Sequence, residues 1–172
     1  MVKLVLEAKM FKKFYPDIRF TSIKDITADI LKEKGISYAL LDIDNTLVSY
    51  TSPLADENAK AFLSMLSEIG VKYAFVSNNH KARVGKFAEE FGAVYVNDAA
   101  KPLLFGIKRA MRKIGAEKGK TALIGDQVFT DVYAGKRAGL LTIMVDPIES
   151  KETPFFAVKR YFEKIVLKDM NH

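Results

Sequence analysis

The chain has 172 residues, of which 49% are hydrophobic and 28% charged, a composition typical of one globular domain with a substantial core. It contains no cysteine, which excludes disulfide bonds and thiolate metal sites, and its two histidines are not at the spacing of a metal site. No run of about 18 apolar residues and no signal peptide is evident, so we expect a cytoplasmic protein without a membrane-spanning segment.

The net charge of +6 is concentrated in one segment. Residues 101–120 contain seven Lys or Arg residues and a single acidic residue, Glu117, so the rest of the chain is neutral in sum. Such a patch indicates a polyanionic partner, either anionic lipid, nucleic acid or a phosphate-rich substrate. The alternative is a solvated helix face. No recognised nucleic-acid motif accompanies the patch, which makes nucleic acid the least favoured partner.

The first half of the predicted core runs from a buried strand over 38–43 to a helix over 56–69. Asp56 is placed to cap that helix and Gly70 to end it. A strand over 71–76, a helix over 80–91 and a strand over 93–96 follow, because apolar runs alternate there with residues at helical spacing.

The second half repeats this alternation. Helices are predicted over 102–114 and 128–138, and strands over 121–124 and 141–145. The pattern predicts an α/β fold, a three-layer Rossmann-like parallel sheet with helices on both faces. We expect one domain over 1–172, with its core at about 37–147, an N-terminal extension over 1–36 and a C-terminal helical tail over 148–172.

Polar residues follow the carboxyl ends of several predicted strands. Ligands bind beyond these ends in open parallel sheets, so the polar residues are expected to form one site. The candidates are Asp42, Asp44, Ser77, Asn78, Lys101, Asp126 and Asp131. A cluster of acidic residues without His or Cys suits a hard cation, most simply Mg²⁺.

The segment Asp42-Ile43-Asp44-Asn45-Thr46 after an apolar strand resembles the first motif of the haloacid dehalogenase-like (HAD) phosphohydrolases. Ser77, Lys101 and the segment 125–131 follow in the order of the other three motifs. The resemblance covers residues 38–146. It implies the HAD fold and a two-step phosphoryl transfer through an aspartyl-phosphate intermediate.

The resemblance also implies a role for each matching residue. Asp42 would be the nucleophile and Asp44 the general acid and base. Lys101 would offset negative charge and Ser77 would bind phosphoryl oxygens. The Mg²⁺ ligands would be the Asp42 and Asp126 carboxylates and the Asp44 backbone carbonyl.

Three of the candidate residues have alternative roles. Asp131 would hold metal-bound water or the loop. The alternative is that it simply caps the following helix. Asn78 would orient the phosphate or the first-motif loop. Ser77 could likewise be an ordinary turn or helix-cap residue.

The spacing of the motifs leaves no room for the cap domain that many HAD enzymes carry. The span from Asp44 to Ser77 is filled by one loop, one helix and one strand, and the span from Ser77 to Lys101 by one helix and one strand. An open site is compatible with a large substrate, a surface-bound substrate, or closure by a partner subunit in a homo-oligomer.

The flanks fit a surface-bound substrate. Aromatic and lysine residues mix over 10–16, and an apolar helical stripe with basic residues is predicted over 155–168. Such a helix suits the surface of an anionic membrane, here its inner face, although packing on the domain is the alternative.

The whole chain also resembles the YqeG-type family, related to the mitochondrial phosphatidylglycerophosphate phosphatases. The likeness rests on segments 14–16, 22–26, 41–48, 77–79 and 125–132. It implies removal of the terminal phosphate of phosphatidylglycerophosphate, with segment 101–120 meeting anionic headgroups. The alternatives are a phosphatase for soluble sugar or nucleotide phosphates, one for phosphorylated macromolecules, and a binding module without catalysis.

Overall fold

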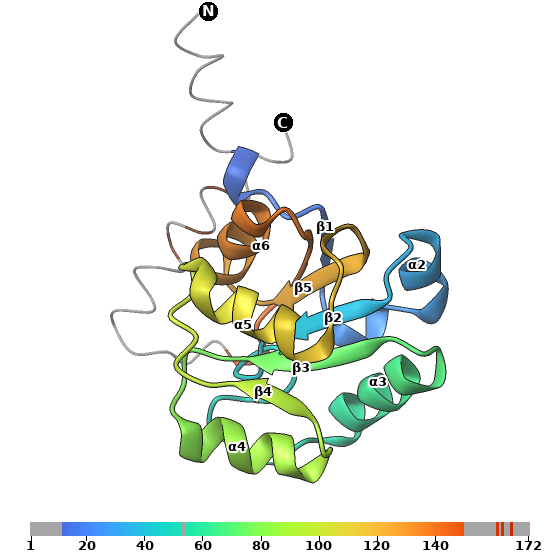
Figure 1. Cartoon of the computed structure of the whole chain (residues 1–172). Coiled ribbons are helices and arrows are strands. Elements are labelled where there is room, and N and C mark those ends of the chain that lie inside the picture. Colours follow the sequence, from blue (N-terminus) through green and yellow to red (C-terminus); the bar gives the residue numbers. More distant parts are fainter. Residues whose placement is uncertain (1–11, 53, 150–160, 162, 164–165, 167–172) are drawn as a thin grey trace, which may run out of the picture.

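The computed structural model describes residues 12–52 and 54–149, together with residues 161, 163 and 166. Its centre is a six-stranded parallel sheet with the order β1-β6-β5-β2-β3-β4 (Figure 1). The strands are β1 (Ile18–Phe20), β2 (Tyr38–Leu41), β3 (Lys72–Val76), β4 (Val94–Val96), β5 (Thr121–Gly125) and β6 (Leu141–Val145).

Helices cover both faces of this sheet, so the predicted three-layer architecture is confirmed. They are α2 (Ala28–Glu33), α3 (Glu57–Glu68), α4 (Lys81–Glu90), α5 (Leu104–Ile114) and α6 (Tyr133–Ala138). Short turns of 3₁₀-helix lie at η1 (Lys12–Phe14), η2 (Ile23–Asp25) and η3 (Lys118–Lys120), and a π-helical turn lies at η4 (Val128–Val132).

Alternate residues of the strands build two separate cores, because successive side chains of a strand point to opposite faces. Leu41 and Phe75 pack with residues of α2, α3 and α4. Leu40 and Ala74 pack with Ile107 of α5 and with residues of α6 on the other face. The central strands are therefore buried on both sides, as expected of a parallel sheet.

The helix and strand predictions hold closely within residues 38–145. Asp56 caps α3, its Oδ1 accepting a bond of 2.8 Å from the backbone N–H of Ala59. The predicted helix over 128–138 instead begins as the π-helical turn η4 and becomes α-helical only in α6. No cap domain lies among the described residues, since α3 and β3 occupy the span between Asp44 and Ser77.

The N-terminal segment does more than extend the domain. Strand β1 pairs with β6, and Arg19 on β1 donates two hydrogen bonds, of 3.1 and 2.7 Å, to Asp146. A three-residue strand is too short to give a periodic signal, which explains why the sequence pattern did not reveal it.

Beyond residue 149, the structure describes only residues 161, 163 and 166. The predicted apolar stripe falls largely outside the described residues, but Val166 is buried against Val128, Val132 and Met144. Among the described residues, no helix has the length and apolar character needed to cross a bilayer.

Gly106 in α5 allows a test of how tightly this helix packs, with Gly85 in α4 as the comparison. A Cβ on Gly106 would lie 2.4 Å from the backbone oxygen of Ala99, whereas one on Gly85 would meet only the hydroxyl end of Tyr95, at 3.2 Å. We expect Gly106→Ala to lower the free energy of unfolding by about 1–3 kcal/mol through overpacking. We expect Gly85→Ala to be neutral or to stabilise by up to about 1 kcal/mol through helix propensity. Chemical denaturation measures both, and equal stabilisation of the two variants would contradict the close approach at Ala99.

Candidate active site

The chain turns sharply after β2 and exposes polar groups at the carboxyl edge of the sheet. The N–H of Asp42 donates to the carbonyl oxygen of Ile124 at 2.9 Å, which ties the start of the turn to β5. The Ile43 oxygen accepts bonds from Leu47 at 2.9 Å and Val48 at 3.1 Å. Asn45 has a φ of 61°, a left-handed conformation that Asn adopts more readily than most residues. The turn thus holds Asp42 and Asp44 at the same edge.

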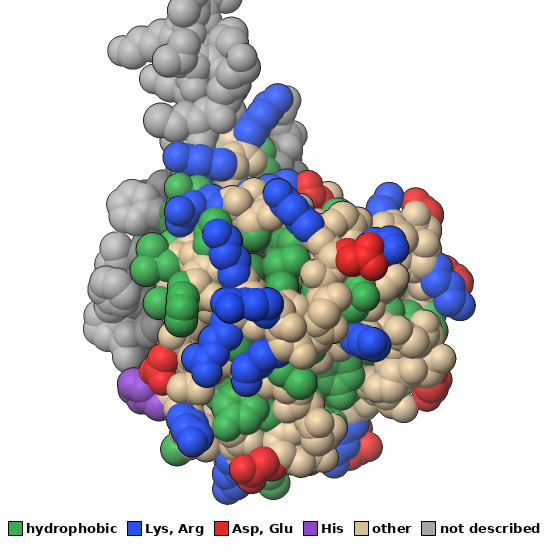
Figure 2. All heavy atoms as spheres, in the orientation of Figure 1, with side chains coloured by type: hydrophobic (Ala, Val, Ile, Leu, Met, Phe, Trp, Pro, Cys, Tyr) green, Lys and Arg blue, Asp and Glu red, His purple; other side chains and the backbone are tan. Residues whose placement is uncertain are grey.

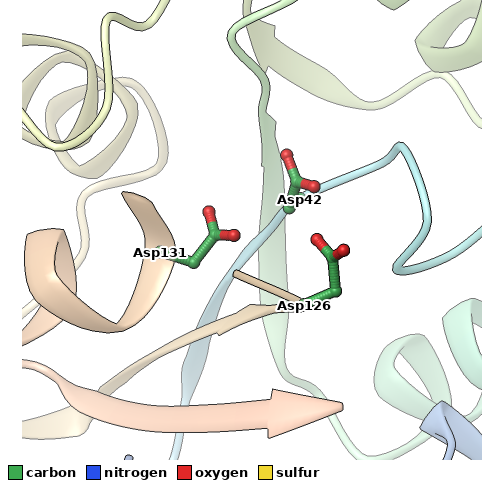
Figure 3. Close-up of side chains that lie close together, drawn as sticks. All are labelled: Asp42, Asp126 and Asp131. Atoms are coloured by element: carbon green, nitrogen blue, oxygen red, sulfur yellow. The ribbon is translucent and has the colours of Figure 1, made fainter. Parts of the chain in front are cut away.

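Three carboxylates from two neighbouring segments converge at this edge (Figure 3). Asp42 follows β2, whereas Asp126 and Asp131 follow β5. Each contributes an oxygen to a group whose atoms all lie within 4.8 Å of one another, and all three residues are buried. The Thr46 hydroxyl lies 3.4 Å from Asp42 Oδ2 and 3.3 Å from Asp126 Oδ1. The arrangement gathers hard oxygen ligands at one buried position.

Lys101 supplies a buried positive charge to this group. Its Nζ donates to Asp42 Oδ1 at 2.7 Å and to Asp131 Oδ1 at 2.6 Å. The Asn78 side chain holds the backbone of Lys101 on both sides, accepting from its N–H at 2.7 Å and donating to its carbonyl at 3.0 Å. Asn78 therefore positions Lys101, and its expected contact with the substrate stays a prediction.

The buried charges shift one another's protonation. Burial, reinforced by Asp131 and Asp126 and opposed by Lys101, raises the pKa of Asp42 to about 8. Burial acts to lower the pKa of Lys101, but the adjacent Asp131 and Asp42 carboxylates outweigh it and raise this pKa above its ordinary value. The Lys101 ammonium therefore stays charged, and the two carboxylates of Asp42 and Asp131 share it.

The position of Asp131 depends on a glycine at the end of β5. A Cβ on Gly125 would lie 2.4 Å from Cγ of Asp131, so only glycine allows the carboxylate this close to the strand. The backbone N–H of Gln127 donates to Asp131 Oδ2 at 3.2 Å. The π-helical turn η4 thus directs Asp131 back towards Lys101, and its expected role in holding metal-bound water or the loop stays a prediction.

Ser77 lies at the end of β3, next to β2 in the sheet, and is buried. Its Oγ accepts a hydrogen bond of 3.0 Å from the N–H of Asn79. Because the hydroxyl acts as an acceptor in that bond, its own hydrogen can donate to a phosphoryl oxygen.

The Asp44 carboxylate lies apart from the three-carboxylate group. Arg83 in the first turn of α4 donates to Asp44 Oδ1 from Nε at 3.1 Å and from Nη2 at 2.9 Å. Asn79 donates to Asp44 Oδ2 at 3.2 Å. Sequence reasoning missed Arg83, although a signal was present. A cation in the first turn of a helix opposes the helix dipole, which indicates an anionic partner nearby.

Comparison with known proteins agrees with this geometry. The model of the haloacid dehalogenase-like hydrolase family matches residues 25–139. The chain is 36% identical, over 92% of both chains, to "Probable phosphatase YqeG" of Bacillus subtilis. It is 25% identical to "Phosphatidylglycerophosphate phosphatase 1, chloroplastic/mitochondrial" of Arabidopsis thaliana, over 97% of this chain and 50% of that protein.

Solved structures share the fold at low sequence identity. A HAD-superfamily hydrolase from Ehrlichia chaffeensis superposes with a TM-score of 0.54 and 15% identity, over 77% of this chain and 98% of that one. The order of the motif residues, the parallel sheet that gathers them and the match over 25–139 all agree with the resemblance found in the sequence. The chain belongs to the haloacid dehalogenase-like hydrolase family.

Proposed function

We propose that this protein is a Mg²⁺-dependent phosphatase that hydrolyses phosphomonoesters through an aspartyl-phosphate on Asp42, and that its preferred substrate is a lipid phosphate. The observation that carries the hydrolytic part is the contact of Lys101 Nζ with both Asp42 and Asp131 inside a buried carboxylate cluster. Its relative YqeG is named a probable phosphatase.

The chemistry follows from two aspartates in different surroundings. An Asp42 oxygen attacks phosphorus, the ester bond breaks, and the leaving oxygen takes a proton from Asp44. Water then attacks the aspartyl-phosphate, Asp44 accepts a proton from that water, and inorganic phosphate leaves with Asp42 restored. Lys101 offsets the charge of the phosphoryl oxygens, and Ser77 donates a hydrogen bond to them.

The residues at the site fit a divalent cation. Asp42, Asp126 and Asp131 bring three buried carboxylates together, whereas the one ammonium beside them, that of Lys101, contacts only Asp42 and Asp131. Negative charge is therefore in excess in a buried place. Oxygen ligands of this kind suit Mg²⁺, with Asp42, Asp126 and the Asp44 carbonyl as its ligands. The bound ion would favour the ionised, nucleophilic form of Asp42 and reduce the repulsion of a phosphate dianion.

Two observations support a lipid substrate. Leu103 and Phe105 follow Lys101 closely in the chain, and they are 58% and 66% exposed. Lys and Arg side chains gather on the face over α5 and α6, with acidic side chains mainly towards its margin (Figure 2). Exposed apolar side chains among cations are suited to an anionic bilayer surface, and this patch adjoins the loop that bears Lys101. A plant relative is named a phosphatidylglycerophosphate phosphatase.

Phosphate release tests the function directly. In the presence of Mg²⁺, we expect release from phosphatidylglycerophosphate in mixed micelles to exceed release from soluble sugar and nucleotide phosphates. Asp42→Asn is expected to abolish release, and Asp44→Asn to slow it by about 10²–10⁴-fold. A preference for a soluble ester would contradict the lipid assignment alone. If Asp42→Asn matched the wild type, the aspartyl-phosphate mechanism itself would be wrong.

Stability against pH tests the charge balance without any substrate. The pKa of Asp42 is raised from 3.8 to about 8, so between these values the folded protein binds more protons than the unfolded chain. Without divalent ions, the free energy of unfolding is expected to fall as pH rises through this window, with a contribution from Asp42 of at most about 1.4 kcal/mol per pH unit.

Asp42→Asn is expected to flatten the slope of the free energy of unfolding against pH. Mg²⁺ is expected to raise the melting temperature of the wild type near neutral pH, and its binding is expected to release protons. Titration calorimetry in two buffers that differ in ionisation enthalpy measures the released protons. Mg²⁺ binding without proton release, together with a slope that Asp42→Asn leaves unchanged, would contradict the raised pKa.

Vesicle binding tests the basic and apolar patch. Lys108→Ala with Arg112→Ala removes two exposed cations from α5, which is expected to weaken binding to phosphatidylglycerol-containing vesicles by roughly 30-fold, at about 1 kcal/mol per charge. Phe105→Ser is expected to weaken binding through loss of an inserted ring. Lys24→Ala with Lys32→Ala, exposed near the other helical layer, is the charge-matched control. If both double variants lost vesicle binding equally, or if the protein bound strongly to pure phosphatidylcholine, membrane binding by this basic and apolar surface would be excluded.

A further inference from the structure

Arg83 has no role in the proposed mechanism, yet its side chain is directed at one of the mechanism's two central residues. Its Nε and Nη2 lie 3.1 and 2.9 Å from the same oxygen of Asp44, and Nη2 also lies 3.3 Å from the carbonyl oxygen of Ser49. The side chains of Arg83 and Asp44 are only 20% and 14% exposed. The pair is therefore largely shielded from water. An ion pair in such surroundings is stronger and more directional than one at the surface.

The other Asp44 oxygen is also held. Asn79 Nδ2 donates to Asp44 Oδ2 at 3.2 Å, while Asn79 Oδ1 accepts from the backbone N–H of His80 at 2.8 Å. Both oxygens of Asp44 thus have partners from the connection between β3 and α4 or from α4 itself. The rotation of this carboxylate is consequently set by elements outside the first-motif turn.

Lys101 and Arg83 divide the two aspartates of the first motif between them. Lys101 contacts Asp42 and Asp131, whereas Arg83 contacts Asp44. Asp44 does not belong to the group of carboxylates suited to a metal. Each aspartate therefore has its own cation, delivered by a different loop or helix.

We propose that Arg83 is a positioning residue that aims the Asp44 carboxyl group at the leaving oxygen of the substrate. This inference rests on the proposed hydrolytic function, in which the ester bond breaks as a proton moves from Asp44 to the leaving oxygen. That transfer leaves a carboxylate on Asp44, and the guanidinium lies against this new charge. Arg83 itself touches neither the phosphoryl group nor the leaving group in this role.

The dependence of rate on the leaving group tests the proposal. A leaving group that is stable as an anion needs little protonation, whereas an alkoxide needs it most. In Arg83→Met we expect formation of the phosphoenzyme to slow by about 10²-fold for an alkyl phosphate and by less than about 5-fold for p-nitrophenyl phosphate. Single-turnover release of the alcohol or phenol isolates this step from hydrolysis of the intermediate.

Three further variants define what the result means. Lys86→Met removes an exposed cation from the same helix and is expected to leave the leaving-group dependence unchanged. Arg83→Lys is expected to recover only part of the alkyl rate, because one ammonium cannot reproduce two guanidinium contacts. Arg83→Met combined with Asp44→Asn is expected to be no slower than Asp44→Asn alone, since both changes remove the same function.

The possible outcomes are distinct. Equal losses for alkyl and nitrophenyl esters, with a raised KM for both, would show that Arg83 binds substrate or only supports the fold, and would overturn the proposal. The proposal would also be overturned if Arg83→Met were folded and active and its rate depended on the leaving group as in the wild type. A wild type that releases phosphate from no ester would instead remove the proposed function, and this inference with it.

Discussion

The buried ammonium of Lys101 is the interaction on which the arrangement of this site depends. It contacts carboxylates that follow two different strands, Asp42 after β2 and Asp131 after β5. Removing one partner from a buried charge pair leaves an uncompensated charge, which is far more destabilising than loss of a surface pair. The position of this one side chain therefore couples the first-motif turn to the segment that follows β5.

Several local features serve to hold Lys101 in place. Asp98 and Ala100 have φ values of 44° and 54°, and a left-handed conformation at a non-glycine residue is unfavourable by about 1–2 kcal/mol. Asn78 binds the Lys101 backbone through both ends of its amide. Gly106 lets α5 approach the same loop closely at Ala99. Backbone strain of this kind persists only where the surroundings enforce it, and here it lies next to the buried charges.

Much of this molecule can be predicted from its sequence because the signals are local. Apolar runs separated by Gly and by capping residues such as Asp56 locate the strands and helices from β2 to β6. Parallel strands then bring their carboxyl ends to one edge, so Asp42, Asp126 and Asp131 could be placed together without coordinates. The site residues on strand ends were therefore accessible from spacing alone.

The remaining features depend on the directions of side chains and on long-range pairing, which the spacing of residues in the sequence does not encode. Nothing in the segment after Ser77 indicates that Asn78 turns towards Lys101 while Asn79 turns towards Asp44. The π-helical turn that directs Asp131 inwards has the same apolar spacing as an ordinary helix start. Strand β1 gains its place from pairing with β6 and from the Arg19–Asp146 pair, both of which involve residues far apart in the chain.

The contrast between Asp42 and Asp44 shows how such directions give chemical meaning to a short motif. The two carboxylates are separated by a single residue, yet Asp42 is buried among other carboxylates and Lys101, while Asp44 lies apart from them in a largely shielded pair with Arg83. Enzymes assign different tasks to neighbouring carboxyl groups through such differences in environment. A nucleophile must keep its negative charge close to phosphorus, whereas an acid and base must gain and lose a proton near the leaving oxygen. Because the Asp42 side chain contacts Lys101 and the Asp44 side chain contacts Arg83, one motif offers a carboxyl group in each of these two environments.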